Sequence, residues 1–150
     1  MSITEECDEV IDFTQNYTPP DPSAYLAMSD DVDLTGGVIA AQTGTIQAAY
    51  IAEQGATLVE FATPEETIAA VRNGEADAVL ADKSFLTPVA EEDAELMIVG
   101  PDVALGGGVG MGIRESDTEL RATFDAAIQS MKDDGSLNAM ITKWEVASTF

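Results

Sequence analysis

Four short apolar runs recur along the middle of the chain and constrain its fold more than any other feature. Each has the length and apolar content of a buried strand. The runs are Val38–Ala41, Thr57–Phe61, Ala76–Ala81 and Leu96–Val99. Helix-like segments occupy the three gaps, at Ile46–Gln54, Pro64–Asn73 and Lys83–Glu91. Because strands that alternate with helices form βαβ units, the pattern predicts an α/β fold with a largely parallel sheet covered on both faces.

The second of these helices carries the strongest local signals. Thr63 is a candidate N-cap, Pro64 stands at the first helical position, Glu66 completes a capping box, and Gly74 follows the last turn. These signals predict a helix from Pro64 to about Asn73.

The flanking regions have a different character. Three prolines within Tyr17–Ser23 remove hydrogen-bond donors and favour extended backbone, so we expect a hinge or crossing segment there. Short strands are predicted beside it, at Val10–Thr14 and Ala24–Met28. We therefore divide the chain into a strand-and-hinge segment (residues 1–36), an α/β lobe (37–100) and a C-terminal segment (101–150).

Two helices are predicted in the C-terminal segment. Ser116 and Glu119 form a second capping-box pattern, and Gly135 ends the helix that follows. Apolar residues at helical spacing are typical of core-facing stripes. They are Leu120, Phe124, Ile128 and Met131 in the first helix, and Leu137, Met140, Ile141 and Trp144 in the second.

Composition excludes several classes of function. The chain has 28 Asp and Glu against six Lys and Arg, a formal net charge of −22 that disfavours nucleic acid as a partner. It has no histidine, which excludes a Ser-His-Asp triad, a Cys-His dyad and a His-ligated zinc site. A single cysteine, Cys7, cannot form an internal disulfide.

Two segments could bind a ligand. Gln42–Gln47 follows a predicted strand and opens a helix, where an anion can be bound, although a threonine cap after a tight glycine turn explains the same residues equally well. Asp82 ends a predicted strand at the edge where α/β sheets bind ligands. Its spacing fits an N-cap of the next helix, or a partner of Lys83, better than a cation-binding role.

Together these segments resemble the polar amino-acid-binding proteins of ABC importers, solute-binding protein family 3, which have the type II periplasmic-binding-protein fold. Four motifs are similar to motifs of this family and occur in the same order along the chain. They are Met1–Thr4 with Val10–Thr14 and Tyr17, Gln42–Thr45, Asp77–Asp82, and Gly110–Asp117 with Asp134–Leu137 and Lys143–Trp144. The resemblance implies one complete α/β lobe, lobe two, plus C-terminal helices that belong to lobe one.

The resemblance also implies roles for individual residues. Ser2 and the Thr45–Ile46 backbone would bind an amino-acid carboxylate, and Asp82 would bind the α-ammonium group. Two positions depart from the family pattern, because Cys7 replaces the carboxylate-binding arginine and Ile46 replaces a threonine. Since a charge-assisted bidentate bond contributes about 1.5–3 kcal/mol, its loss weakens binding roughly ten- to a hundredfold.

In the family, the motif at Met1–Thr4 lies in mid-chain, so we expect most of lobe one to be missing here. No signal peptide is recognised at the N-terminus, and periplasmic localisation is implied by resemblance only. We expect a solute-binding component of a polar amino-acid ABC importer, or a truncated relative, whose ligand binding is weakened or lost. Its implied partners are a polar amino acid and a transporter permease, with no metal and no cofactor.

Two alternatives remain. One is a self-associating interaction protein derived from such a binding protein, in which the apolar stripes of the last two helices form a homodimer interface. The other is a dehydratase-like enzyme that uses Asp82 for proton transfer, although the residues favour a protein that is not an enzyme.

Overall fold

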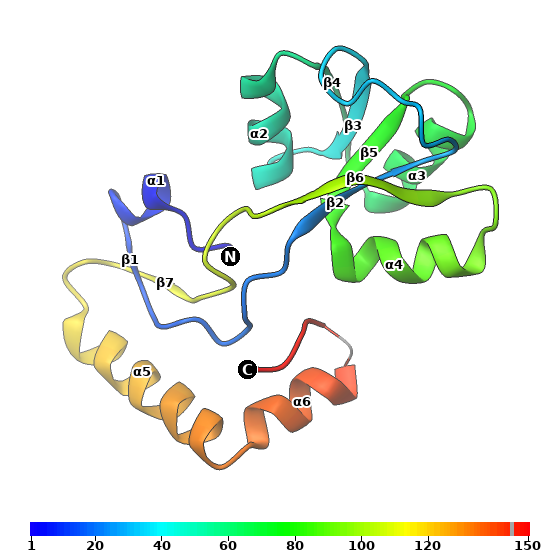
Figure 1. Cartoon of the computed structure of the whole chain (residues 1–150). Coiled ribbons are helices and arrows are strands. Elements are labelled where there is room, and N and C mark those ends of the chain that lie inside the picture. The colour runs from blue at the N-terminus through cyan, green and yellow to red at the C-terminus, as the bar shows by residue number, and fades with distance from the viewer. Residues whose placement is uncertain (145) are drawn as a thin grey trace. The chain divides into compact units, whose positions relative to one another are not determined.

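The computed structural model describes residues 1–144 and 146–150, which form two compact units (Figure 1). The sheet unit comprises Pro22–Leu105, and the terminal unit comprises Met1–Asp21 together with Gly106–Phe150. The sheet unit begins at Pro22 instead of the predicted residue 37, because the strand at Ser23–Ala27 is an integral part of its sheet.

The sheet unit contains a mixed five-stranded sheet in the order β4-β3-β5-β2-β6. The strands are β2 (Ser23–Ala27), β3 (Val38–Gln42), β4 (Thr57–Phe61), β5 (Ala78–Asp82) and β6 (Met97–Val103). β3 is parallel to β4 and β5, whereas β2 is antiparallel to both β5 and β6. The prediction of a largely parallel sheet was therefore wrong, because β2 inserts between two strands that follow it by more than fifty residues.

Side-chain alternation gives the sheet two apolar faces. Along β2, Ala24 and Leu26 pack with helices α3 (Pro64–Arg72) and α4 (Lys83–Glu92), while Tyr25 and Ala27 pack with α2 (Ile46–Gln54). All five residues of β2 are buried, which explains why this strand reads as an unbroken apolar run. Helices thus cover both faces, as predicted.

The terminal unit is smaller and has its own core. It holds helix α1 (Glu5–Asp8), an antiparallel pair of strands β1 (Asp12–Phe13) and β7 (Gly112–Ile113), and helices α5 (Thr118–Asp133) and α6 (Ser136–Trp144). Its core consists of Ile128, Leu137 and Ile141, with Tyr17 and Met111 packed against them. Of the helices in the described part of the chain, none has both the length and the hydrophobicity required to span a bilayer.

One expectation for the last helices was wrong. The second capping box does not form, because Asp117 occupies the N-cap position of α5 and its side chain makes no capping hydrogen bond. The predicted apolar stripes are partly buried and partly exposed. Ile128, Leu137 and Ile141 are buried inside the terminal unit, whereas Leu120, Phe124, Met140 and Trp144 remain exposed.

Candidate functional site

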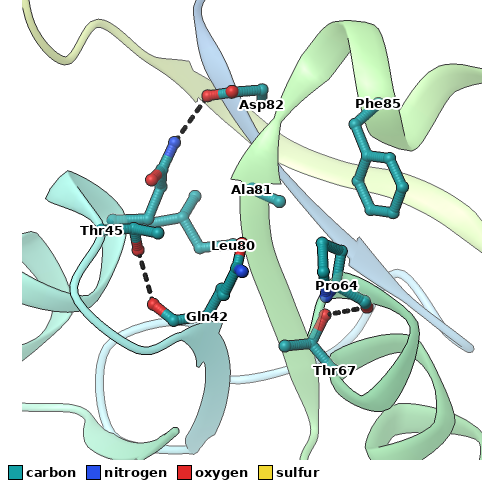
Figure 2. Close-up of a pocket in the computed structure, with 9 residues that line it drawn as sticks. Gln42, Thr45, Pro64, Thr67, Leu80, Ala81, Asp82 and Phe85 are labelled. Carbon is teal, nitrogen blue, oxygen red and sulfur yellow. Dashed lines mark hydrogen bonds between the residues drawn. The ribbon is translucent and has the colours of Figure 1, made fainter. Parts of the chain in front are cut away.

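A pocket of about 260 Å³ lies at the carboxyl ends of β3 and β5, within the sheet unit (Figure 2). Gln42 is the last residue of β3 and Asp82 is the last residue of β5. Because these strands are parallel neighbours, their ends meet at one edge of the sheet, where α/β proteins bind ligands. The pocket is lined by Gln42, Thr45, Gln47, Pro64, Thr67, Leu80, Ala81, Asp82 and Phe85.

A glycine turn shapes the wall formed by the start of α2. Gly44 has a φ of 74°, which lets the chain reverse between β3 and α2. Thr45 then caps the helix, because its Oγ1 accepts a hydrogen bond from the Ala48 N–H (3.2 Å) and donates to the Gln42 carbonyl oxygen (2.8 Å). The first turn of α2 thus presents backbone N–H groups and the positive end of the helix dipole at this edge.

Asp82, at the end of β5, also lines the pocket. Asp82 occupies the N-cap position of α4, but its side chain makes no capping hydrogen bond. Instead, its Oδ1 accepts a hydrogen bond of 2.6 Å from Gln47 Nε2. Lys83, the next residue, forms an ion pair with Asp102.

The remaining wall comes from the starts of α3 and α4. Thr67 is buried and its hydroxyl donates to the Pro64 carbonyl oxygen at 2.6 Å, and both residues line the pocket (Figure 2). Phe85 contributes an aromatic ring, and Leu80 and Ala81 supply apolar surface from β5. The pocket therefore combines one carboxylate and several polar groups with an apolar lining, which is typical of small-molecule sites.

The predicted site residues fall into both units. Thr45 and Asp82 line the pocket, and Ile46 is the first residue of α2 without being among the lining residues. Ser2 and Cys7 belong to the terminal unit, where Ser2 forms a β-bridge with Val109 and Cys7 lies in α1. The roles predicted for Ser2 and Cys7 therefore stay predictions.

Several pocket residues received no individual ligand-binding role from the sequence. Gln47, Pro64, Thr67 and Phe85 line the pocket although they lie on three different helices. A buried glutamine in the first turn of a helix is a detectable signal, because such an amide needs a specific partner. The identity of that partner depends on which strand ends beside it, and that is decided by tertiary structure.

The site is built from groups that recognise charge and shape. Among the described residues, no cluster of three or more His, Cys, Asp or Glu side chains is arranged to hold a metal ion. A carboxylate attracts a cationic group, and the N-terminus of a helix attracts an anionic one. The two stand at one sheet edge here, an arrangement that suits a small zwitterion.

Comparisons with known proteins identify relatives of this chain. The arginine-binding periplasmic protein of Mannheimia haemolytica is 27% identical over 150 residues, covering 96% of this chain and 63% of that protein. The lysine/arginine/ornithine-binding periplasmic protein of Escherichia coli (strain K12) is 26% identical over 162 residues, with 96% and 62% covered. This chain therefore spans less than two thirds of the length of these relatives.

A solved structure is much more similar. The periplasmic His/Glu/Gln/Arg/opine family-binding protein from Silicibacter pomeroyi, crystallised in complex with lysine, is 70% identical with a TM-score of 0.89. The match covers 100% of this chain and 70% of that protein. The fold is therefore the type II periplasmic-binding-protein fold of such proteins.

The family model matches residues 1–147, almost the whole sequence. Its members and the relatives above are solute-binding proteins, so the dehydratase alternative is set aside. The chain belongs to the bacterial extracellular solute-binding proteins, family 3.

Proposed function

We propose that this chain is a solute-binding component of a polar amino-acid ABC importer, and that its pocket binds the charged backbone groups of an amino acid. The observation that carries the proposal is the placement of Asp82 and the Thr45-capped start of α2 around one pocket. Asp82 would bind the α-ammonium group, and the first turn of α2 would bind the α-carboxylate.

The relatives support the class of ligand. The Mannheimia haemolytica protein is named for binding arginine, and the Escherichia coli protein for binding lysine, arginine and ornithine. The Silicibacter pomeroyi protein was crystallised with lysine. They are periplasmic, and relatives of this kind serve ABC transporters. We therefore propose a periplasmic location and a transporter permease as the macromolecular partner of this chain.

We propose further that binding is weak. By resemblance, Cys7 replaces an arginine that pairs with the ligand's carboxylate, and a thiol supplies neither its positive charge nor its paired donors. Ile46 has no hydroxyl, so it can bind a carboxylate only through its backbone N–H. We expect no free amino acid to bind more tightly than about high micromolar.

Titrations with arginine, lysine, histidine, glutamate and glutamine test this proposal. In calorimetry and ¹⁵N NMR, we expect weak binding of at least one, with the largest shifts at the amides of Thr45, Gln47 and Asp82. Asp82→Asn should weaken binding about tenfold, since a hydrogen bond to a charged group is replaced by a neutral one. Glu91→Gln, an exposed change on α4 outside the pocket, removes the same charge and should leave binding unchanged.

Two results would contradict it. A sub-micromolar dissociation constant for any of these amino acids would show that binding is not weakened. Unchanged pocket amides at about 20 mM of every amino acid, far above a millimolar dissociation constant, would show that the pocket does not bind them.

A second function, self-association, is favoured by an apolar groove in the terminal unit. The groove measures about 670 Å³ and includes Met1, Ile11, Met111, Ile113, Leu120 and Phe124 among its lining residues. Leu120 and Phe124 are 47% and 37% exposed, so the groove leaves apolar surface in water. A homodimer that covers the groove would bury this surface.

A further inference from the structure

Gln47 is a buried polar side chain with an unusual pair of partners. It is only 6% exposed, and its Nε2 atom donates to Ser23 Oγ at 3.0 Å and to Asp82 Oδ1 at 2.6 Å. A glutamine amide nitrogen carries two hydrogens, so one nitrogen can serve both acceptors. The contacts join residues that are 24 and 35 positions away in the sequence.

The sheet register brings these partners together. Ser23 and Asp82 are directly opposite each other in the antiparallel pair formed by β2 and β5. Side-chain alternation places both on the sheet face that packs against α2, since Tyr25 and Leu80, two residues away, belong to the cluster with Ala48 and Ile51. Gln47, in the first turn of α2, therefore meets the carboxylate where β5 ends.

We propose that Gln47 is a positioning residue that orients the Asp82 carboxylate and thereby makes the pocket selective for ligands with an α-ammonium group. The ligand named in this inference rests on the proposed function, whereas the orientation of Asp82 by Gln47 does not depend on it. The hydrogen bond to Oδ1 restricts rotation of the side chain of Asp82, an exposed residue at the end of β5. A carboxylate can accept several hydrogen bonds, so the Gln47 amide and a ligand ammonium can be bound together.

The second partner of the Gln47 amide, Ser23, fixes the amide against the sheet. Ser23 is fully buried at the start of β2, so it holds the Gln47 amide from the side of the sheet. The amide in turn holds Asp82, whose short charge-assisted contact is the stronger of the two. A preorganised carboxylate loses less conformational entropy when a ligand binds.

The chain offers a matched control in the same pocket. Gln42 also lines the pocket, but its Nε2 donates to the Ala62 carbonyl oxygen and not to Asp82. Gln42→Leu and Gln47→Leu thus make the same chemical change in the same pocket. Only the second removes a hydrogen bond to Asp82.

The first experiment needs no ligand. Three-bond couplings between Asp82 N and Cγ report its χ1 rotamer in the full chain by NMR. We expect one dominant rotamer in the wild type and in Gln42→Leu, and rotamer averaging in Gln47→Leu. If the Asp82 couplings in a folded Gln47→Leu variant equal those of the wild type, the inference is overturned, whatever the protein binds.

The second experiment compares L-lysine with 6-aminohexanoate, which has the same chain length and lacks the α-amino group. We expect Gln47→Leu to weaken L-lysine binding about tenfold and to change 6-aminohexanoate binding less than twofold. Gln42→Leu should not change the ratio of the two dissociation constants. Equal weakening of both ligands by Gln47→Leu would indicate a merely structural role and would overturn the inference.

Two further variants keep the test decisive if Gln47→Leu does not fold. Gln47→Met keeps the length of the side chain without the amide donor and should also free the Asp82 rotamer. Ser23→Ala should produce the same pattern more weakly, because it removes only the second support of the amide. If the wild type shifts with neither ligand, the proposed function fails, while the couplings still decide the role of Gln47.

Discussion

Asp33 organises the loop before β3 through a single carboxylate oxygen. Its Oδ1 accepts hydrogen bonds from the Thr35 N–H (3.0 Å), the Thr35 hydroxyl (2.9 Å) and the Gly36 N–H (3.0 Å). These bonds favour the charged form, so the Thr35 and Gly36 backbone N–H groups, followed by the Thr35 hydroxyl, lower the pKa of Asp33. A lowered pKa in the folded state stabilises the fold above the pKa of the unfolded chain, and this contribution is lost as the pH falls through the folded value.

We therefore expect Asp33→Asn to change how the free energy of unfolding depends on pH in the acid range. At pH 7 the variant should unfold at a lower urea concentration than the wild type. The difference should shrink as the pH falls below about 4, the pKa of an unfolded aspartate, and should close once the pH has passed the lowered pKa of folded Asp33. Urea unfolding between pH 2.5 and 7 measures this. Asp30→Asn removes the same charge from the same loop and is the control. A wild-type advantage that persists at the lowest pH would contradict the assignment.

Among the helices, local capping sequences are not equivalent. At α3, Thr63 Oγ1 accepts from the Glu66 N–H (3.3 Å) and Glu66 Oε2 accepts from the Thr63 N–H (3.1 Å), so the predicted capping box is confirmed. At α5 the same pattern begins one residue too early, and Ser116 donates to the side chain of Asp117 instead. The difference is the position at which the backbone enters the helix.

This contrast makes a paired prediction. Thr63→Ala should lower the free energy of unfolding by about 1 kcal/mol, because it leaves a backbone N–H of the first turn without its cap. Ser116→Ala should change it by less than about 0.5 kcal/mol, as for ordinary exposed substitutions. Chemical denaturation of the two variants gives both values. Equal losses would show that Ser116 caps α5 in solution.

At the scale of the whole molecule, a charge of −22 and an exposed apolar groove act in opposite directions. Like charges repel two copies over roughly a Debye length, which is about 10 Å at 0.1 M salt. Burial of the groove favours association through the hydrophobic effect. Added salt screens the repulsion and leaves the apolar term, so association should strengthen with ionic strength.

Light scattering at low and high salt tests the proposed homodimer. We expect a mass near twice the 15.8 kDa of one chain at high salt and micromolar concentration, with more monomer at low salt. Phe124→Asp should give a monomer, because it places a charge in the groove. Met97→Asp, an equally exposed apolar position on β6 outside the groove, should not. A monomer mass at both salt concentrations would refute self-association.

The sequence by itself determined those features that depend on neighbouring residues. Helices at Ile46–Gln54 and from Pro64 to about Asn73 were predicted because caps, glycine stops and apolar spacing act within a few residues, and the structure has them at Ile46–Gln54 and Pro64–Arg72. The threonine cap at Thr45 and the position of Asp82 at a strand end could be read in the same way. The motif order was sufficient to indicate the family.

Only the tertiary structure decided how distant segments pair. The apolar sequence of a strand indicates that the strand is buried, but it does not indicate which strands lie beside it or in which direction they run. The place of β2 between β5 and β6 could therefore not be predicted. The same holds for the burial of Ile128, Leu137 and Ile141 in the terminal unit. It holds above all for the pocket, because the contact of Gln47 with Ser23 and Asp82 exists only once β2 and β5 lie side by side beneath α2.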